Sequence, residues 1–144
     1  MDLLDWSPLE IVHRFSEDRI CASSLRARIA RAVAEALKDS EKSREDTAAA
    51  MTEWLGEDVS VHMLNAWASQ AREDHSIPYQ RLLALVHVTG DVRLLQLGAE
   101  MFGHSVVDDR YLPWVEVGQL ADQRDAVERA FETARRTARK GGGR

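Results

Sequence analysis

Apolar side chains recur at spacings of three and four residues along most of the chain, which is the period of an amphipathic helix. In one clear stretch the apolar positions on a single face are Leu25, Ile29, Ala32, Val33, Ala36 and Leu37. We find no sustained alternation of apolar and polar residues, the pattern that indicates a half-buried strand. Proline and glycine are also scarce in the interior of the chain. The pattern therefore predicts an all-α fold.

Serine, proline and glycine mark where these helices begin and end. A serine before an apolar stripe is a typical N-cap, and a glycine after it permits the left-handed conformation with which many helices stop. These signals predict a bundle of five helices between about Ser23 and Gly103. The predicted starts are Ser23 or Ser24, Ser43, Ser60, Pro78 and Asp91, and the predicted stops include Gly56, Gly90 and Gly103.

Two further helices are predicted outside this bundle. Ser7, Pro8 and Glu10 have the pattern of a helix start, and Leu9, Val12 and Phe15 form a short apolar stripe. Pro113 begins a long helix that extends to about Lys140. The predicted organisation is a helical arm at 1–22, the bundle at 23–103, the C-terminal helix at 104–140 and a disordered tail at 141–144.

Composition narrows the class of protein. A chain of 144 residues with 44% hydrophobic residues is long enough for one compact domain with appendages. No stretch approaches the roughly 18 uncharged apolar residues of a membrane span. The acidic start MDLLDWSPLE lacks the basic residues of a secretory signal, so we expect a cytoplasmic protein. Cys21 is the single cysteine, and its apolar neighbours predict a small buried side chain.

The segment 43–69 has the features of a helix pair joined by a tight turn. Small alanines at 48 and 49 permit close packing, Gly56 permits a sharp link, and Leu64 and Trp67 are apolar anchors of the second helix. The outward face of that helix then carries Val61, His62 and Asn65, with Ala66 and Ser69 as further candidates. A major groove is wide enough to admit a helix, and an asparagine amide pairs in two places with adenine.

The segment VSVHMLNAW at 59–67 resembles the recognition helix of the lambda-repressor/Cro-like helix-turn-helix family. In that family a serine starts the helix, an aliphatic residue follows at the fourth position and a tryptophan three later, as Ser60, Leu64 and Trp67 do here. The segment YQRLLALVHVTG at 79–90, followed by DVRLL, is similar to phage regulators of the CII-like kind. The resemblance covers about 23–103 and implies a five-helix repressor-like bundle.

The resemblance implies a DNA-binding transcriptional regulator of phage or prophage type, which binds operator DNA with the helix at 60–69. We expect double-stranded DNA and a second copy of the chain as partners, because a homodimer contacts two half-sites about one DNA turn apart. The DNA-binding residues expected from this interpretation are Ser43, Arg44, Ser60, Val61, His62, Asn65, Ser69 and Arg72.

The charge balance favours an alternative, a protein–protein interaction module on the same bundle that does not bind DNA. The net charge is −5, and residues 41–75 alone hold three basic and eight acidic side chains. In this interpretation Leu3, Leu4 and Trp6 dock on a protein partner. An apolar stripe in the C-terminal helix (Leu120, Val127, Phe131 and Ala134) is compatible with packing on the bundle or with dimerisation.

We expect no enzymatic activity and no cofactor, since the chain has no phosphate-binding loop, dinucleotide fingerprint or nucleophile elbow. The histidines lack the spacing of a metal site, and His87, on an apolar stripe, is predicted to be a core residue.

Overall fold

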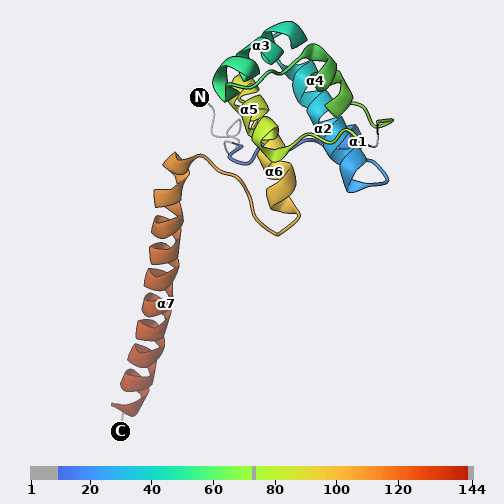
Figure 1. Cartoon of the computed structure of the whole chain (residues 1–144). Coiled ribbons are helices and arrows are strands. Elements are labelled where there is room, and N and C mark those ends of the chain that lie inside the picture. Colours follow the sequence, from blue (N-terminus) through green and yellow to red (C-terminus); the bar gives the residue numbers. More distant parts are fainter. Residues whose placement is uncertain (1–9, 73, 143–144) are drawn as a thin grey trace, which may run out of the picture. The chain divides into compact units, whose positions relative to one another are not determined.

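The computed structural model describes residues 10–72 and 74–142 (Figure 1). These residues are helical or irregular and include no strand, which confirms the all-α class. The described residues form seven α-helices and a short 3-10 helix. The chain divides into two compact units, and the boundary along the sequence lies between Val106 and Val107. We describe each unit by itself.

The first helix, α1 (Glu17–Ile20), is shorter and later than predicted. Residues 10–16 are not helical, so the predicted helix over Val12 and Phe15 is wrong there; its start at 7–9 lies outside the described residues. The cause is tertiary. Phe15 is buried in the core, and the guanidinium carbon of Arg93 lies 4.2 Å from the centre of its ring. Burial of an aromatic ring outweighs the weak helix preference of so short a segment.

The next two helices follow the local signals closely. α2 (Leu25–Asp39) is capped by Ser24, whose Oγ accepts a hydrogen bond from the Ala27 backbone N–H at 3.1 Å. α3 (Arg44–Leu55) is capped by Ser43, whose Oγ accepts from the Asp46 N–H at 3.1 Å. It ends at Gly56, which has a φ of 72°. Only glycine adopts this left-handed conformation without strain.

Three shorter helices complete the first unit: α4 (Val61–Trp67), α5 (Tyr79–Thr89) and α6 (Arg93–Glu100). Pro78 precedes α5, and Gly90 ends it with a φ of 69°. The predicted cap of α6 needs a correction, since the residue at the cap position is Val92. The carboxylate of Asp91 still accepts the Arg93 backbone N–H, at 3.2 Å, from one position further out.

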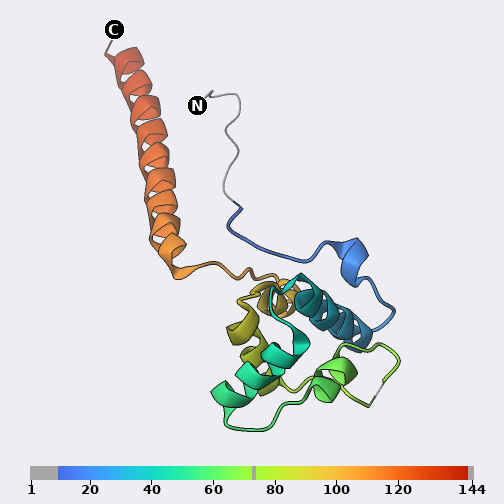
Figure 2. The same ribbon diagram turned by 90° about the horizontal axis from the view of Figure 1, so that it is seen from above.

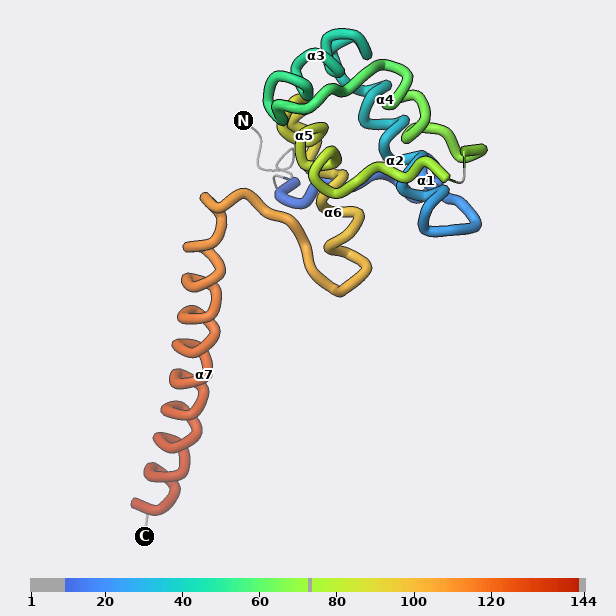
Figure 3. The backbone as a smooth tube through the Cα atoms, viewed as in Figure 1, coloured from blue at the N-terminus to red at the C-terminus, as the bar shows by residue number. Residues whose placement is uncertain are grey.

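The core of the first unit is formed by one apolar face of each helix. α3 packs against α5 and α4, while α2 contacts α1, α4 and α6 (Figures 1 and 2). The fully buried side chains from these elements include Ile20, Val33, Met51, Leu64 and Leu85. Figure 3 shows the chain passing from α3 through a short link into α4, and then through a longer link to α5. In the fold, α4 contacts α2 and α3, and a longer irregular segment connects it to α5.

Two side chains predicted to be buried are exposed. Cys21 lies at the end of the four-residue helix α1, where the chain turns toward α2, and its side chain faces solvent. His87 lies on the outer side of α5, and its ring stacks on the exposed Trp54 of α3 with centroids 4.8 Å apart. The stacked contact with Trp54 accounts for an aromatic residue at this position of α5. The apolar residues next to His87 in the sequence do not indicate this contact.

The second unit contains η2 (Asp109–Tyr111) and α7 (Leu112–Gly141). Pro113 lies in the first turn of α7, where a proline needs no hydrogen-bonding partner for its nitrogen. The helix has 30 residues, none of them buried. Among the described residues, no helix is long and apolar enough to cross a membrane.

Candidate nucleic-acid interface

The Thr52 hydroxyl group binds both backbone groups of Val59 in the link between α3 and α4. Thr52 Oγ1 accepts a hydrogen bond from the Val59 backbone N–H at 2.9 Å. Its own hydrogen is within reach of the Ala48 carbonyl at 2.9 Å and the Val59 carbonyl at 3.1 Å. Val59 is itself buried, so the link is anchored by its side chain and its backbone together. These contacts fix the direction in which α4 leaves α3.

The inner face of α4 is anchored in the core. Leu64 and Trp67 are buried, which confirms their prediction as apolar anchors. Arg81 of α5 covers the ring of Trp67, with the guanidinium carbon 5.7 Å from the ring centre. Ala66, a candidate for the outer face, is 2% exposed and must be removed from that face. Its small side chain therefore lies against the bundle and not on the outer face.

The outer face of α4 is formed by His62 and Asn65, which are both exposed. They are three residues apart, so they lie on the same side of the helix. Val61 is only half-buried and packs on the edge of the hydrophobic core. The polar surface of α4 is therefore narrower than the predicted set of Val61, His62 and Asn65.

A contact between α3 and α4 adds a charge to this face. The Nη1 group of Arg44, in the first turn of α3, donates a hydrogen bond to the side-chain oxygen Oδ1 of Asn65. The two residues are 21 positions apart, and both were predicted as DNA contacts with no expectation that they touch. Sequence spacing carries no signal for this pairing, since it depends on the angle between the helices. The result is a cation held beside an amide whose NH₂ group remains able to donate.

The remaining predicted residues lie around this pair in different roles. The hydroxyl oxygens of Ser43 and Ser60 accept backbone N–H groups of their own helices, from Asp46 and Met63 respectively. Ser60 and Met63 also complete a capping box, because the Ser60 N–H approaches the Met63 sulfur at 3.5 Å. Both serines thus act first as helix caps.

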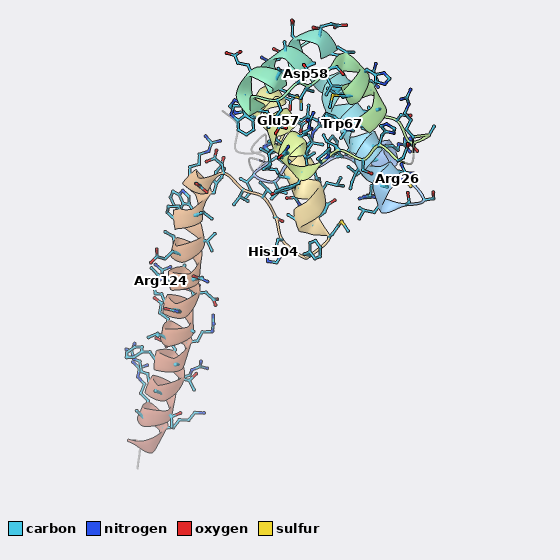
Figure 4. All side chains as sticks on the ribbon, in the orientation of Figure 1. Arg26, Glu57, Asp58, Trp67, His104 and Arg124 are labelled. Atoms are coloured by element: carbon cyan, nitrogen blue, oxygen red, sulfur yellow. The ribbon has the colours of Figure 1, made fainter. Side chains whose placement is uncertain are left out.

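Ser69 and Arg72 lie in the segment that follows α4. Ser69 is half-buried, and its backbone N–H donates to the Ala66 carbonyl at 3.3 Å. The Arg72 side chain is exposed, while its backbone carbonyl accepts from Nη1 of Arg26 at 3.2 Å. Arg26 belongs to α2, and Figure 4 shows it near the α1 end of that helix. Sequence analysis missed Arg26, because its contact with this segment spans 46 residues.

Acidic side chains occur at both ends of α3. Glu45 and Asp46 are exposed in its first turn, and Glu57 and Asp58 follow its last (Figure 4). The Glu57 carboxylate is partly balanced, since its Oε2 accepts from Gln80 at 3.0 Å and lies 3.4 Å from Arg81 Nη2.

Further along the chain, a hydrogen bond from His75 holds the pKa of Asp74 below its ordinary value. Asp74 therefore retains its negative charge near the end of this surface, and the site combines an Arg44–Asn65 pair with an acidic border.

Nothing in the described residues gathers three or more His, Cys, Asp or Glu side chains in a way that could hold a metal ion. No protein-family model, curated protein or solved structure matches this chain.

Proposed function

We propose that this chain is a DNA-binding transcriptional regulator of phage or prophage type, in which α3 and α4 form a helix-turn-helix. In this proposal α4 enters the major groove of operator DNA. The observation that carries the proposal is the outer face of α4, where His62 and Asn65 are exposed and Arg44 is bonded to Asn65. Short polar side chains beside a guanidinium are suited to base edges and to the neighbouring phosphates.

Each residue of this face has a definite role in the proposal. Asn65 donates and accepts at the edge of an adenine, and His62 contacts the adjacent base. Arg44 gives up its bond to Asn65 Oδ1 when that oxygen meets a base, and pairs with a phosphate. Arg72 neutralises a second phosphate from the segment that follows α4. Because few cations are involved, the dependence of binding on salt should be shallow for a DNA-binding protein.

The first experiment is fluorescence anisotropy of the full chain with random duplex DNA at low and moderate salt. We expect binding that weakens as salt rises. Selection from a random duplex library then supplies a preferred site. On that site Asn65→Ala should cost roughly 1–3 kcal/mol, and on random DNA almost nothing. The matched control is Gln119→Ala, which removes an exposed amide from α7 and should leave both affinities unchanged.

Arg44→Ala separates phosphate contact from base contact. It should weaken binding to selected and random duplexes by the same factor and reduce the slope of log affinity against log salt by about one. Loss of affinity for the selected site alone would instead assign Arg44 to a base. An equal effect of Asn65→Ala on both duplexes would exclude Asn65 as a base contact.

A protein–protein interaction module is the second candidate. Two observations favour it: the acidic surplus of residues 41–75 and an apolar depression of about 280 Å³ on the first unit. Side chains of α2, α5 and α6 line the depression, among them Leu25, Ile29, Tyr79, Leu94 and Leu97. The Leu3, Leu4 and Trp6 of the original hypothesis lie outside the described residues. Absence of DNA binding even at low salt would favour this candidate over the first.

A further inference from the structure

The long helix α7 has an apolar stripe, interrupted at Arg124, that no described residue of its own unit covers. The apolar members of the stripe are Val117, Leu120, Val127, Phe131 and Ala134; with Arg124 included, the positions follow one another at alternating intervals of three and four residues. This is the spacing of the inner positions of a coiled coil, and Arg124 occupies the one inner position that is charged. The side chains of Val127 and Phe131 are 68% and 61% exposed. Figure 4 shows side chains projecting from every side of α7.

The charges of α7 are separated along its length. Residues 112–128 contain four acids and one base, which gives a net charge of −3. Residues 129–141 contain five bases and one acid, which gives +4. The acids of the first segment are Glu116, Asp122, Asp125 and Glu128; the bases of the second are Arg129, Arg135, Arg136, Arg139 and Lys140. The first part of α7 is thus negatively charged and the second part positively charged, and the apolar stripe runs through both.

We infer that α7 pairs with α7 of a second copy of this chain, in antiparallel orientation. The charge distribution identifies a second copy as the binding partner of the apolar stripe, because an antiparallel second copy brings each acidic segment against a basic one. A parallel pair places the two +4 segments side by side and the two −3 segments likewise, and like charges at that distance repel. The apolar stripe supplies the attraction, and the charges determine the orientation.

The heptad positions also agree when Leu112 lies level with Arg139 of the second copy, so that the two helices overlap along most of their length. Phe131 then comes level with Leu120 of the second copy, and Ala134 with Val117 of the second copy. The large Phe131 side chain thus faces the smaller Leu120, and the small Ala134 side chain faces Val117. Arg124 comes level with Val127 and Glu128 of the second copy. Its guanidinium therefore has a carboxylate beside it, which accounts for a charge at an inner position.

This inference does not rest on DNA binding, and either can fail without the other. The dimer is measured without DNA, and the anisotropy experiment above is performed without any assumption about α7. If both hold, the α7 pair joins two DNA-binding units into one molecule.

The orientation is tested on the full chain by measuring the distance between spin labels. Cys21→Ser removes the single native thiol, and Thr137→Cys then carries the label. In an antiparallel pair the two labels are separated by about 23 residues of helix, or about 35 Å at 1.5 Å per residue. In a parallel pair they lie within about 15 Å, near the distance between two packed helices. The matched control, Ala126→Cys in the same background, lies at the centre of α7 and should give a short distance in the antiparallel pair.

Sedimentation equilibrium tests the pairing itself. We expect a dimer whose affinity falls about tenfold or more in Phe131→Asp, since a central apolar side chain is replaced by a charge. Thr133→Asp, two residues further on the outward side of the helix, should leave the affinity unchanged. Raising the salt to about 1 M should weaken an antiparallel dimer, because attraction between the segments is screened. A monomer, a label distance below about 15 Å at position 137, or a dimer strengthened by salt would each overturn the inference.

Discussion

Replacement of Leu64 by alanine tests whether α4 is held in place by the core. The helix has seven residues, too few to be stable in isolation, so its anchors decide its position. Leu64 is fully buried. Its truncation loses three buried carbons, worth about 2.4 kcal/mol, and the cavity left behind raises the total to about 3–4 kcal/mol. That is a large share of the roughly 5–15 kcal/mol by which a domain is stable.

The assay is urea unfolding followed by far-UV circular dichroism. With an m value of about 2 kcal/mol/M, Leu64→Ala should lower the midpoint by about 1.5–2 M. The control is Leu25→Ala, the same change at a side chain that is 48% exposed, for which we expect about 1 kcal/mol or less. A midpoint for Leu64→Ala as high as that of the control would refute the reasoning. It would mean that α4 is held by its capping box and the Thr52 contacts rather than by its buried face.

Two further changes probe the turn and the charged contacts. Gly56→Ala should lower the free energy of unfolding by about 1 kcal/mol, measured by the same urea titration. An added Cβ meets no atom within 4 Å there, so a loss much above this would contradict an origin in backbone conformation alone. Asp39→Asn tests a carboxylate whose pKa is held below its ordinary 3.8 by hydrogen bonds from Arg93 and Arg19. A lowered pKa in the folded state stabilises the fold above the unfolded pKa, and this stability is lost as the pH falls through the folded value. Asp39→Asn should therefore be less stable than the parent at about pH 6, by under about 1 kcal/mol, and this difference should shrink as the pH is lowered below 3.8; a difference that does not shrink would exclude this linkage.

The sequence predicted those features that depend on neighbouring residues. Ser24 and Ser43 cap helices, and Gly56 and Gly90 end them, because each signal acts within one turn of backbone. The buried positions of Leu64 and Trp67 follow from helical periodicity in the same way.

The features that the sequence did not predict depend on contacts between distant residues. Phe15 lies in the core although its segment is irregular, because its ring packs in the bundle and against the Arg93 guanidinium. The contacts of Arg44 with Asn65 and of His87 with Trp54 are set by how two helices cross. Most residues of the candidate site could therefore be proposed from the sequence, but their arrangement could not; Arg26 was missed, and Ala66 is buried. Its central feature, a guanidinium bonded to the amide that is proposed to contact a base, required the structure.

The contacts of the Thr52 hydroxyl lower the entropy cost of binding a partner at α4. Because the hydroxyl joins the last turns of α3 to the residue before the Ser60 cap, the start of α4 loses little freedom when a partner binds. Ordering such a surface costs less than ordering a loose one, so even a small set of polar contacts yields measurable affinity. The other end of α4 leads into a longer link, which is tied to α2 by the hydrogen bond from Arg26 Nη1 to the Arg72 carbonyl.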